Sequence, residues 1–303
     1  MHDQIAVLED RAVKLSNLQK ILFPGGSLTK ADLIDYYRRI APVMLPHVAG
    51  RPLSFERYPD GVAAEGFMQK NASDHFPSWI RRARLAKQDG VVDHVVAEDR
   101  ETLIYLANQA CITFHVWLSR IDRVDHPDRM VLDLDPSDDD FAKVRWAARE
   151  TRALLEELGL APFLQITGSR GLHVWVPLDG SADFDRVRQF ASEVAERLVA
   201  RRPRELTTAQ RKAKRGDRIF VDVARNAYAQ TAVAPYSVRA RPQAPVATPI
   251  DWAELEDPKL GPQRYTIRNI FRRLARKRDP WADIERHARP VHAAQERLAA
   301  LAA

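Results

Sequence analysis

The sequence predicts an α/β protein of the α+β type, with a mixed central sheet and flanking helices. The chain has 303 residues and is 45% hydrophobic, which is enough for a large packed core. From residue 130 onward the expected elements run strand, helix, strand, strand, helix, strand, which is the split β-α-β pattern of a ferredoxin-like sheet. The two middle strands are too close in sequence for a helical crossover, so a continuous doubly wound sheet is disfavoured.

One clear helix is expected in the first half of the chain, over residues 29–40. Thr29 offers a side-chain oxygen for the N-cap, and Pro42 and Pro46 are expected to end the helix. Its apolar face consists of Leu33, Tyr36, Tyr37 and Ile40. The stretch 50–80 is expected to be loop and strand with exposed aromatic side chains.

In the second half, a strand is expected at Met130–Asp135, followed by an amphipathic helix that ends at Gly159. The helix carries apolar or small residues at Val144, Ala147, Ala148, Thr151, Leu154, Leu155 and Leu158. The remaining expected elements are strands at 163–167, 172–178 and 219–223 and helices at 183–199 and 265–276. The proline-rich segment 235–262 is expected to be an extended arm over the surface, and the alanine-rich C-terminal end is expected to fray.

Basic residues are clustered rather than spread evenly. Lysine and arginine number 47 against 41 acidic residues, which gives a net charge of +6. The segment Arg201–Arg218 holds eight basic residues and Arg264–Arg278 holds seven. Such clustering indicates binding to a polyanion, although a solvated helix face is the favoured explanation of any one cluster.

The chain contains a single cysteine, Cys111, which excludes an internal disulfide framework and a CxxC metal site. It lies in the apolar stretch 103–118, which is expected to be partly helical and to bury the thiol. No apolar run reaches the ~18 residues that a membrane span needs. The N-terminus lacks the profile of a secretory signal, so a cytoplasmic protein is expected.

The most informative stretch is MVLDLDPSDDD, at 130–140. Since residues i and i+2 of a strand point the same way, Asp133 and Asp135 share one face. Two close carboxylates repel and lose hydration, and a divalent cation removes both penalties. Asp222 lies on the polar face of the strand at 219–223 and is the natural third ligand. Three such carboxylates predict two Mg²⁺ or Mn²⁺ ions, the arrangement used in nucleotidyl transfer.

Three other kinds of acidic segment have a similar pattern. An EF-hand loop fails, because its sixth position is Asp138 and its twelfth is Val144. A phosphohydrolase with Asp133 as nucleophile stays open, although no later acidic pair follows an apolar strand. A solvated acidic turn that caps the next helix accounts for Asp138, Asp139 and Asp140, but not for the two acids inside the strand.

The turn TGSRG at 167–171 is typical of a hairpin and also fits a phosphate-binding turn. Gly168 and Gly171 permit a tight backbone whose N–H groups face an anion, and Arg170 adds charge. His173 alternates with apolar neighbours and so points to the polar face of its strand. The turn is not a Walker A loop, because the lysine and the following helix are absent.

Four motifs along the chain resemble one family. They are LSNLQKILFPGGSLTKADLIDYY, LDLDP, TGSRGLHVWVPL and FVDVARNAYAQTAVAPYSVRARPQAPVATPIDWAEL. Together they resemble the polymerase domain of bacterial ligase D (LigD), within the archaeo-eukaryotic primase-polymerase superfamily. The resemblance runs from about Val13 to Arg278 and implies a primase-polymerase fold. It also implies a template-dependent polymerase of non-homologous end joining that often prefers ribonucleotides and Mn²⁺.

The resemblance also assigns roles to individual residues. Asp133, Asp135 and Asp222 are expected to be catalytic and to hold the two metal ions. The residues expected to bind the incoming nucleotide are His115, Thr167, Ser169, Arg170, His173, Arg225 and Arg239, with Arg215 a weaker candidate. Those expected to bind a DNA 5′-phosphate are Asn17, Lys20 and Lys30, and Phe67 is expected to stack on a template base.

Several positions depart from the family pattern. Thr167 replaces a serine but keeps the hydroxyl, and Arg170 replaces a lysine but keeps the charge. Met68 replaces a second aromatic residue, which puts a template wedge of two rings in doubt. Apart from the resemblance, Lys20 and Lys30 are ordinary surface lysines and His115 is equally well a core histidine.

The expected organisation is one primase-polymerase domain over 1–303. It comprises an N-terminal module at about 1–125 with the DNA-binding surface, a catalytic module at about 126–250 and a C-terminal arm and helix at about 251–303. A stand-alone polymerase and a domain excised from a multidomain ligase both stay open, and the start at Met1 slightly favours the first. Expected partners are gapped or overhanging DNA ends with a 5′-phosphate, NTP or dNTP, a Ku-like protein and a ligase, in a nucleoid-associated bacterial setting. A non-catalytic DNA-end-binding module is the further alternative.

Overall fold

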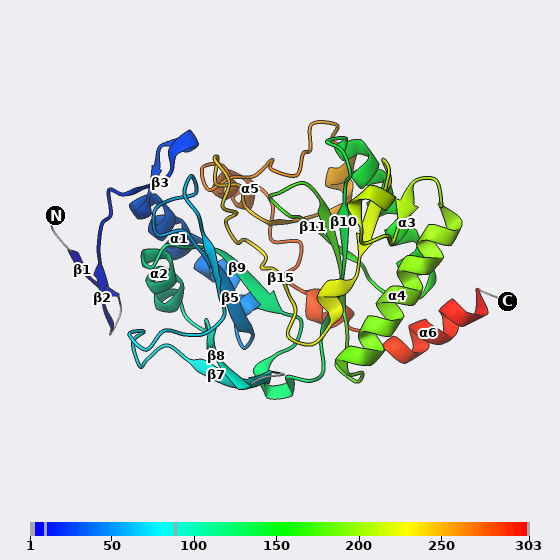
Figure 1. Ribbon diagram of the computed structural model, residues 1–303, viewed down its shortest axis with the longest axis horizontal. Coiled ribbons are helices and arrows are strands. Elements are labelled where there is room, and N and C mark those ends of the chain that lie inside the picture. Colours follow the sequence, from blue (N-terminus) through cyan, green and yellow to red (C-terminus); the bar gives the residue numbers. More distant parts are fainter. Residues whose placement is uncertain (1–3, 9–10, 88–89, 302–303) are drawn as a thin grey trace. The chain divides into compact units, whose positions relative to one another are not determined.

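The computed structural model describes residues 4–8, 11–87 and 90–301 (Figure 1). The chain forms two compact units. The first consists of Met1–Val116, Val233–Ala247 and Tyr265–Arg276, and the second of Trp117–Ala232, Thr248–Arg264 and Lys277–Ala303. The expected modules at 126–250 and 251–303 therefore each contribute to both units.

The second unit contains a six-stranded sheet. Its strands are β10 (Arg129–Asp135), β11 (Phe163–Ile166), β12 (Leu172–Pro177), β13 (Leu206–Thr207), β14 (Ile219–Asp222) and β16 (Thr248–Ile250). They lie in the order β13-β14-β10-β12-β11-β16, with only β13 and β14 parallel among the five neighbouring pairs. The central order β14-β10-β12-β11 is that of a ferredoxin-like sheet, so the predicted fold class is confirmed.

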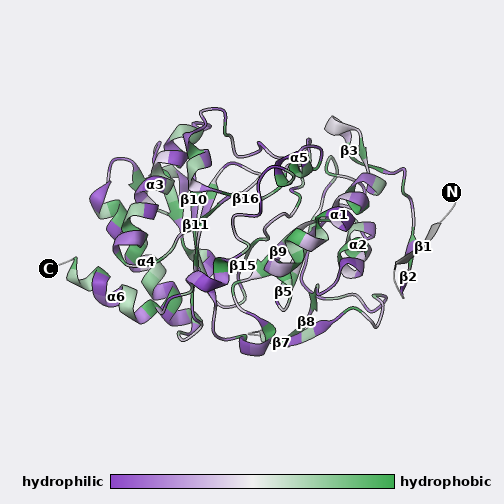
Figure 2. Cartoon of the chain, turned by 180° about the vertical axis from the view of Figure 1, so that it is seen from behind, coloured by the Kyte–Doolittle hydropathy of each residue, from purple (hydrophilic) through white to green (hydrophobic). Residues whose placement is uncertain are grey.

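Two amphipathic helices, α3 (Phe141–Glu157) and α4 (Phe184–Arg201), pack against this sheet. Each begins at an aspartate whose carboxylate accepts a backbone N–H, Asp140 from Ala142 and Asp183 from Arg186. Their green apolar faces alternate with purple polar ones in Figure 2. The helical cap predicted for Asp140 is therefore confirmed.

Helix α6 (Val291–Ala300) occupies the C-terminal end that the sequence predicted to fray. Up to Ala300 that prediction is wrong, because Val291, Ala294 and Leu298 are buried and α6 packs on α4, whereas residues 302–303 lie outside the described residues. Packing of an apolar face stabilises a ten-residue helix that would be marginal alone.

The first unit contains a second sheet, built from β5 (Pro52–Arg57), β6 (Phe67–Gln69), β7 (Arg82–Lys87), β8 (Gly90–Val96) and β9 (Cys111–Trp117). Its order is β9-β5-β8-β7, with β6 paired to β5 and with β15 (Thr231–Val233) beside β9. Two short pairs precede it, β1 (Gln4–Leu8) with β2 (Arg11–Leu15) and β3 (Ile21–Phe23) with β4 (Leu28–Thr29). Cys111 is fully buried, as predicted, and the stretch 103–118 divides between a helix and β9.

The helices of the first unit are α1 (Lys30–Val48), α2 (Arg100–Asn108) and α5 (Ile270–Leu274). Helix α1 begins at the Thr29 capping box but continues through both prolines, so the predicted end is wrong. Its apolar face extends through Met44 and Val48, both fully buried, and this packing compensates for the hydrogen bonds that the prolines remove.

Helix α5 is shorter than the predicted helix over 265–276. The Tyr265 carbonyl accepts a hydrogen bond from the Val246 N–H at 2.8 Å and is therefore unavailable to a helical turn. None of the helices in the described part of the chain has the length and apolar character that a membrane crossing requires.

The proline-rich segment 235–262 is not the predicted surface arm. In the first unit Val238 and Val246 are fully buried, and in the second unit β16 adds an edge strand beside β11. Pro249 lies in β16, where an edge position tolerates a residue without a backbone N–H. The apolar residues between the prolines are thus used in both cores.

Candidate metal and nucleotide site

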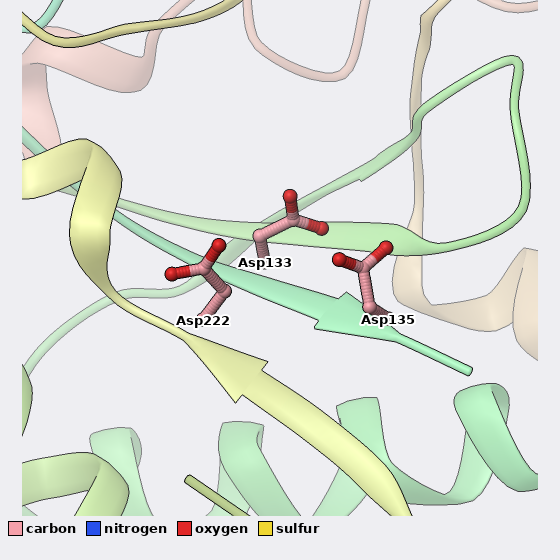
Figure 3. Close-up of side chains that lie close together, drawn as sticks. All are labelled: Asp133, Asp135 and Asp222. Carbon is pink, nitrogen blue, oxygen red and sulfur yellow. The ribbon is translucent and has the colours of Figure 1, made fainter. Parts of the chain in front are cut away.

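The three predicted carboxylates lie on two neighbouring strands of the second unit. In β10, Leu132 and Leu134 are fully buried, whereas Asp133 and Asp135 alternate onto the opposite face. Asp222 of β14 is directly across the ladder from Asp133. Figure 3 shows the three carboxylates gathered on the face of the sheet that is turned away from the helices.

One oxygen of each carboxylate lies within 4.8 Å of the others. Burial, followed by the charge of Asp133, raises the pKa of Asp135 to about 6, with Asp222 adding to the effect. His173 and Arg170 act in the opposite direction. The cluster therefore concentrates negative charge that the surrounding cations only partly offset.

This donor set fits divalent cations. Carboxylate oxygens are the ligands that Mg²⁺ and Mn²⁺ prefer, and a cation between them removes their mutual repulsion. Within the described ranges, this is the one group of three or more metal-ligating side chains that lie this close together. The predicted convergence of Asp133, Asp135 and Asp222 is confirmed, and their role as metal ligands stays a prediction.

Two contacts fix the carboxylates in place. His173 lies opposite Asp133 in β12, with its Nε2 at 3.3 Å from the Asp133 carboxylate. The Asp222 carboxylate accepts a hydrogen bond from the Ala224 N–H at 2.8 Å. The His173 ring is buried, and its Nδ1 has no hydrogen-bond partner within the described part of the chain. A buried ring nitrogen without a partner favours a polar ligand at the site.

The turn between β11 and β12 is closed by its own polar groups. The Thr167 hydroxyl donates to the Gly171 carbonyl at 3.0 Å and accepts from the Ser169 N–H at 3.2 Å. Gly168 has a φ of +68°, which favours glycine. Arg170 is exposed, and the Ser169 carbonyl accepts from Gln263 at 2.9 Å. These hydrogen bonds hold the turn next to Asp135.

Gly171 is required by close approach, since a Cβ there would lie 2.3 Å from the Leu134 carbonyl oxygen of β10. We expect Gly171→Ala to lower the free energy of unfolding by about 1–3 kcal/mol, because the strand next to it must shift. Denaturant unfolding measures this. Gly261→Ala is the matched control, because nothing lies within 4 Å of a Cβ at that position. Equal stability of the two variants would contradict the close approach.

Sequence reasoning missed Asn226, which is fully buried after β14. Its side chain accepts from the Val131 N–H at 2.9 Å and donates to the Val131 carbonyl at 2.7 Å. These bonds continue the ladder between β10 and the segment after Asp222. A lone asparagine in a turn carries no periodic signal, so only the structure could identify it.

Of the remaining nucleotide-binding candidates, Arg225 is exposed in the second unit, whereas His115 and Arg239 lie in the first unit. His115 Nε2 is 3.0 Å from the Glu56 carboxylate. Arg215 has a structural role, because it donates to the Ala209 and Gln210 carbonyls.

The candidates for 5′-phosphate binding also lie in the first unit. Lys20 pairs with Asp60 at 2.6 Å, and Asn17 precedes it with a φ of +53°. Lys30 is not the surface lysine that composition suggested. It is 6% exposed and donates to the Asn108 carbonyl at 2.9 Å, because α1 packs on α2.

Phe67 and Met68 are each 48% exposed on β6. The Arg57 guanidinium lies 5.5 Å from the centre of the Phe67 ring. An exposed ring beside a cation is suited to stacking on a base.

The chain was compared with known proteins. The family model described as "LigD, primase-polymerase domain" matches residues 29–281. LigD of Mycolicibacterium smegmatis is 37% identical over 256 residues, which are 84% of this chain and 34% of that protein. LigD of Bacillus subtilis is 32% identical over 277 residues, which are 91% of this chain and 44% of that protein. The chain thus spans less than half the length of these relatives.

Among solved structures, the polymerase domain of Mycobacterium tuberculosis ligase D in complex with DNA matches with a TM-score of 0.86 and 34% identity. The match covers 92% of this chain and all of that one. The ferredoxin-like sheet with three clustered carboxylates defines the class as a primase-polymerase protein. This chain belongs to the LigD primase-polymerase domain family.

Proposed function

We propose that this protein is a template-directed nucleotidyltransferase that extends primers and fills gaps at DNA double-strand breaks, in non-homologous end joining. The observation that carries the proposal is the cluster of Asp133, Asp135 and Asp222 on one face of the sheet. Membership of the LigD family and the likeness to a DNA-bound polymerase domain support it.

In this proposal the three aspartates hold one or two divalent cations, Mn²⁺ or Mg²⁺. When bound there, such cations would lower the pKa of a primer 3′-hydroxyl and neutralise charge on a nucleoside triphosphate. The primer oxygen, its proton released to water, would form a bond to the α-phosphorus as the bond from that phosphorus to pyrophosphate breaks. The backbone N–H groups of the Thr167–Gly171 turn, with Ser169, orient the triphosphate, and Arg170 and His173 add positive charge.

We assign the remaining nucleotide contacts to His115, Arg225 and Arg239. Asn17, Lys20 and Lys30 bind the downstream 5′-phosphate in this proposal, and a template base stacks on Phe67. Ribonucleotides are the favoured substrates, and a Ku-like protein and a DNA ligase are the proposed partners, in the bacterial cytoplasm at the nucleoid. Lys20 must exchange Asp60 for the phosphate, which its exposed ion pair permits at little cost.

Primer extension on a gapped duplex with a downstream 5′-phosphate tests the proposal. We expect templated addition of a nucleotide with Mn²⁺ or Mg²⁺ and none with EDTA. DNA binding is expected to weaken steeply between 50 and 200 mM salt, by roughly 10³-fold if six phosphates are contacted. Binding without extension would favour a non-catalytic end-binding module, and metal-dependent hydrolysis of a simple phosphoester without DNA would favour a phosphohydrolase.

A further inference from the structure

An acidic side chain lies against one of the proposed nucleotide contacts in the first unit. Strands β5 and β9 are antiparallel, with Ser54 opposite His115 and Glu56 opposite Thr113. Phe55 and Phe114 are fully buried on the core face, so Glu56 and His115 share the other face. The Glu56 carboxylate is 3.0 Å from His115 Nε2, and the two side chains are 23% and 14% exposed.

Glu56 is ionised in this setting. Burial opposes its charge, but the hydrogen bond and charge of His115, the charge of Arg239 and the Thr113 hydroxyl together hold the pKa of Glu56 below its ordinary value. Among the described residues, Tyr37 and Tyr58 also interact with this carboxylate, and the pKa of each is raised mainly by burial. Arg241 also acts on Tyr58. The carboxylate thus lies among His115, Arg239 and two neutral phenols.

We propose that Glu56 is a positioning residue for nucleotide binding, which fixes the His115 ring and keeps it as an imidazolium that faces phosphate together with Arg239. This inference rests on the proposed nucleotidyltransferase function and deepens it. No sequence motif points to Glu56, because the pairing arises from the register of β5 and β9.

The two ring nitrogens of His115 explain why its charge state matters for phosphate binding. With Nε2–H donated to Glu56, a neutral ring has only a lone pair at Nδ1, which repels a phosphate oxygen. The imidazolium carries a proton on both nitrogens, so Nδ1 becomes a charge-assisted donor while Glu56 still holds Nε2. A carboxylate within hydrogen-bonding distance favours that charged form, and Glu56 therefore extends phosphate binding to higher pH.

The first test is the binding of GTP in the presence of Mn²⁺, measured by calorimetry on the full chain between pH 5.5 and 8.5. We expect Glu56→Gln to weaken binding by about tenfold at pH 8, the size of one charge-assisted hydrogen bond, and by little at pH 5.5. Glu56→Asp should restore part of the affinity. Glu65→Gln, on an exposed acid of the same unit, should leave binding unchanged.

A double variant separates positioning from a general loss of fold. In a His115→Ala background, Glu56→Gln should cause no further loss of GTP affinity, because its effect passes through the ring. NMR titration of His115, which needs neither DNA nor turnover, should give a midpoint roughly one pH unit lower in Glu56→Gln than in the parent protein.

The inference is overturned if Glu56→Gln leaves the His115 midpoint unchanged, if it weakens GTP equally at every pH, or if its effect persists without His115. Failure of the proposed function is a different result. If the parent protein binds GTP in this Glu56-dependent way but does not extend primers, that result contradicts the proposed polymerase activity but not the role of Glu56.

Discussion

Replacement of Asp133 by asparagine is expected to abolish primer extension while the fold persists. Asparagine has nearly the same shape, but it removes one of the three proposed anionic ligands and the charge that faces His173. Metal ions supply several kcal/mol of stabilisation to a developing charge, so the rate should fall by roughly a thousandfold or more. Single-turnover extension on the gapped duplex measures this directly, and Mn²⁺ affinity should fall in parallel.

Asp139→Asn is the matched control, since Asp139 is an exposed acid of the following loop and lies outside the cluster. It should extend primers at the parent rate. Asp222→Asn should resemble Asp133→Asn, because both residues bind the same ions in this proposal. A severe loss with Asp133→Asn but full activity with Asp222→Asn would indicate that Asp133 acts as a nucleophile instead.

Replacement of Asp135 by asparagine should stabilise the metal-free protein at neutral pH, although the same change should abolish activity. The pKa of Asp135 is raised from its ordinary 3.8 to about 6, first by burial and then by Asp133. Ionised Asp135 therefore costs the folded state roughly 2–3 kcal/mol. Asparagine removes that charge at similar volume.

The pH dependence follows from the direction of this shift. The folded chain binds the proton more tightly than the unfolded chain, so the contribution of neutral Asp135 is complete at low pH. This stabilising contribution is lost as the pH rises from about 4 to about 6. Above pH 6 the free-energy cost of ionised Asp135 to the folded state stays constant. The melting temperatures of the parent and Asp135→Asn proteins in EDTA should therefore diverge across this window.

Mn²⁺ provides a second comparison. A cation bound to the folded state stabilises the parent protein by an amount that grows with the logarithm of its concentration relative to Kd, and the gain should be much smaller in Asp135→Asn. If the melting temperatures of the two proteins differed by the same amount at every pH from 4 to 8, this would contradict the electrostatic strain assigned to this cluster.

Much of the second unit could be predicted from the sequence. The period-2 alternation in MVLDLD placed Asp133 and Asp135 on one face, and the helix over 141–157 followed from apolar spacing and an aspartate cap. The misassigned elements share a cause. Helix α1 passes through Pro42, α6 does not fray, and segment 235–262 is buried, because packing outweighs local propensity at each place.

The sequence by itself determined which way each side chain faces along its own strand or helix, because that depends on a repeat of two or 3.6 residues. Only the tertiary structure decided which distant groups meet. It set Asp222 opposite Asp133, buried Lys30 against the Asn108 carbonyl and brought Glu56 to His115, which is 59 residues away. Strand register and helix packing create such contacts, and they depend on the whole fold rather than on any local pattern of residues.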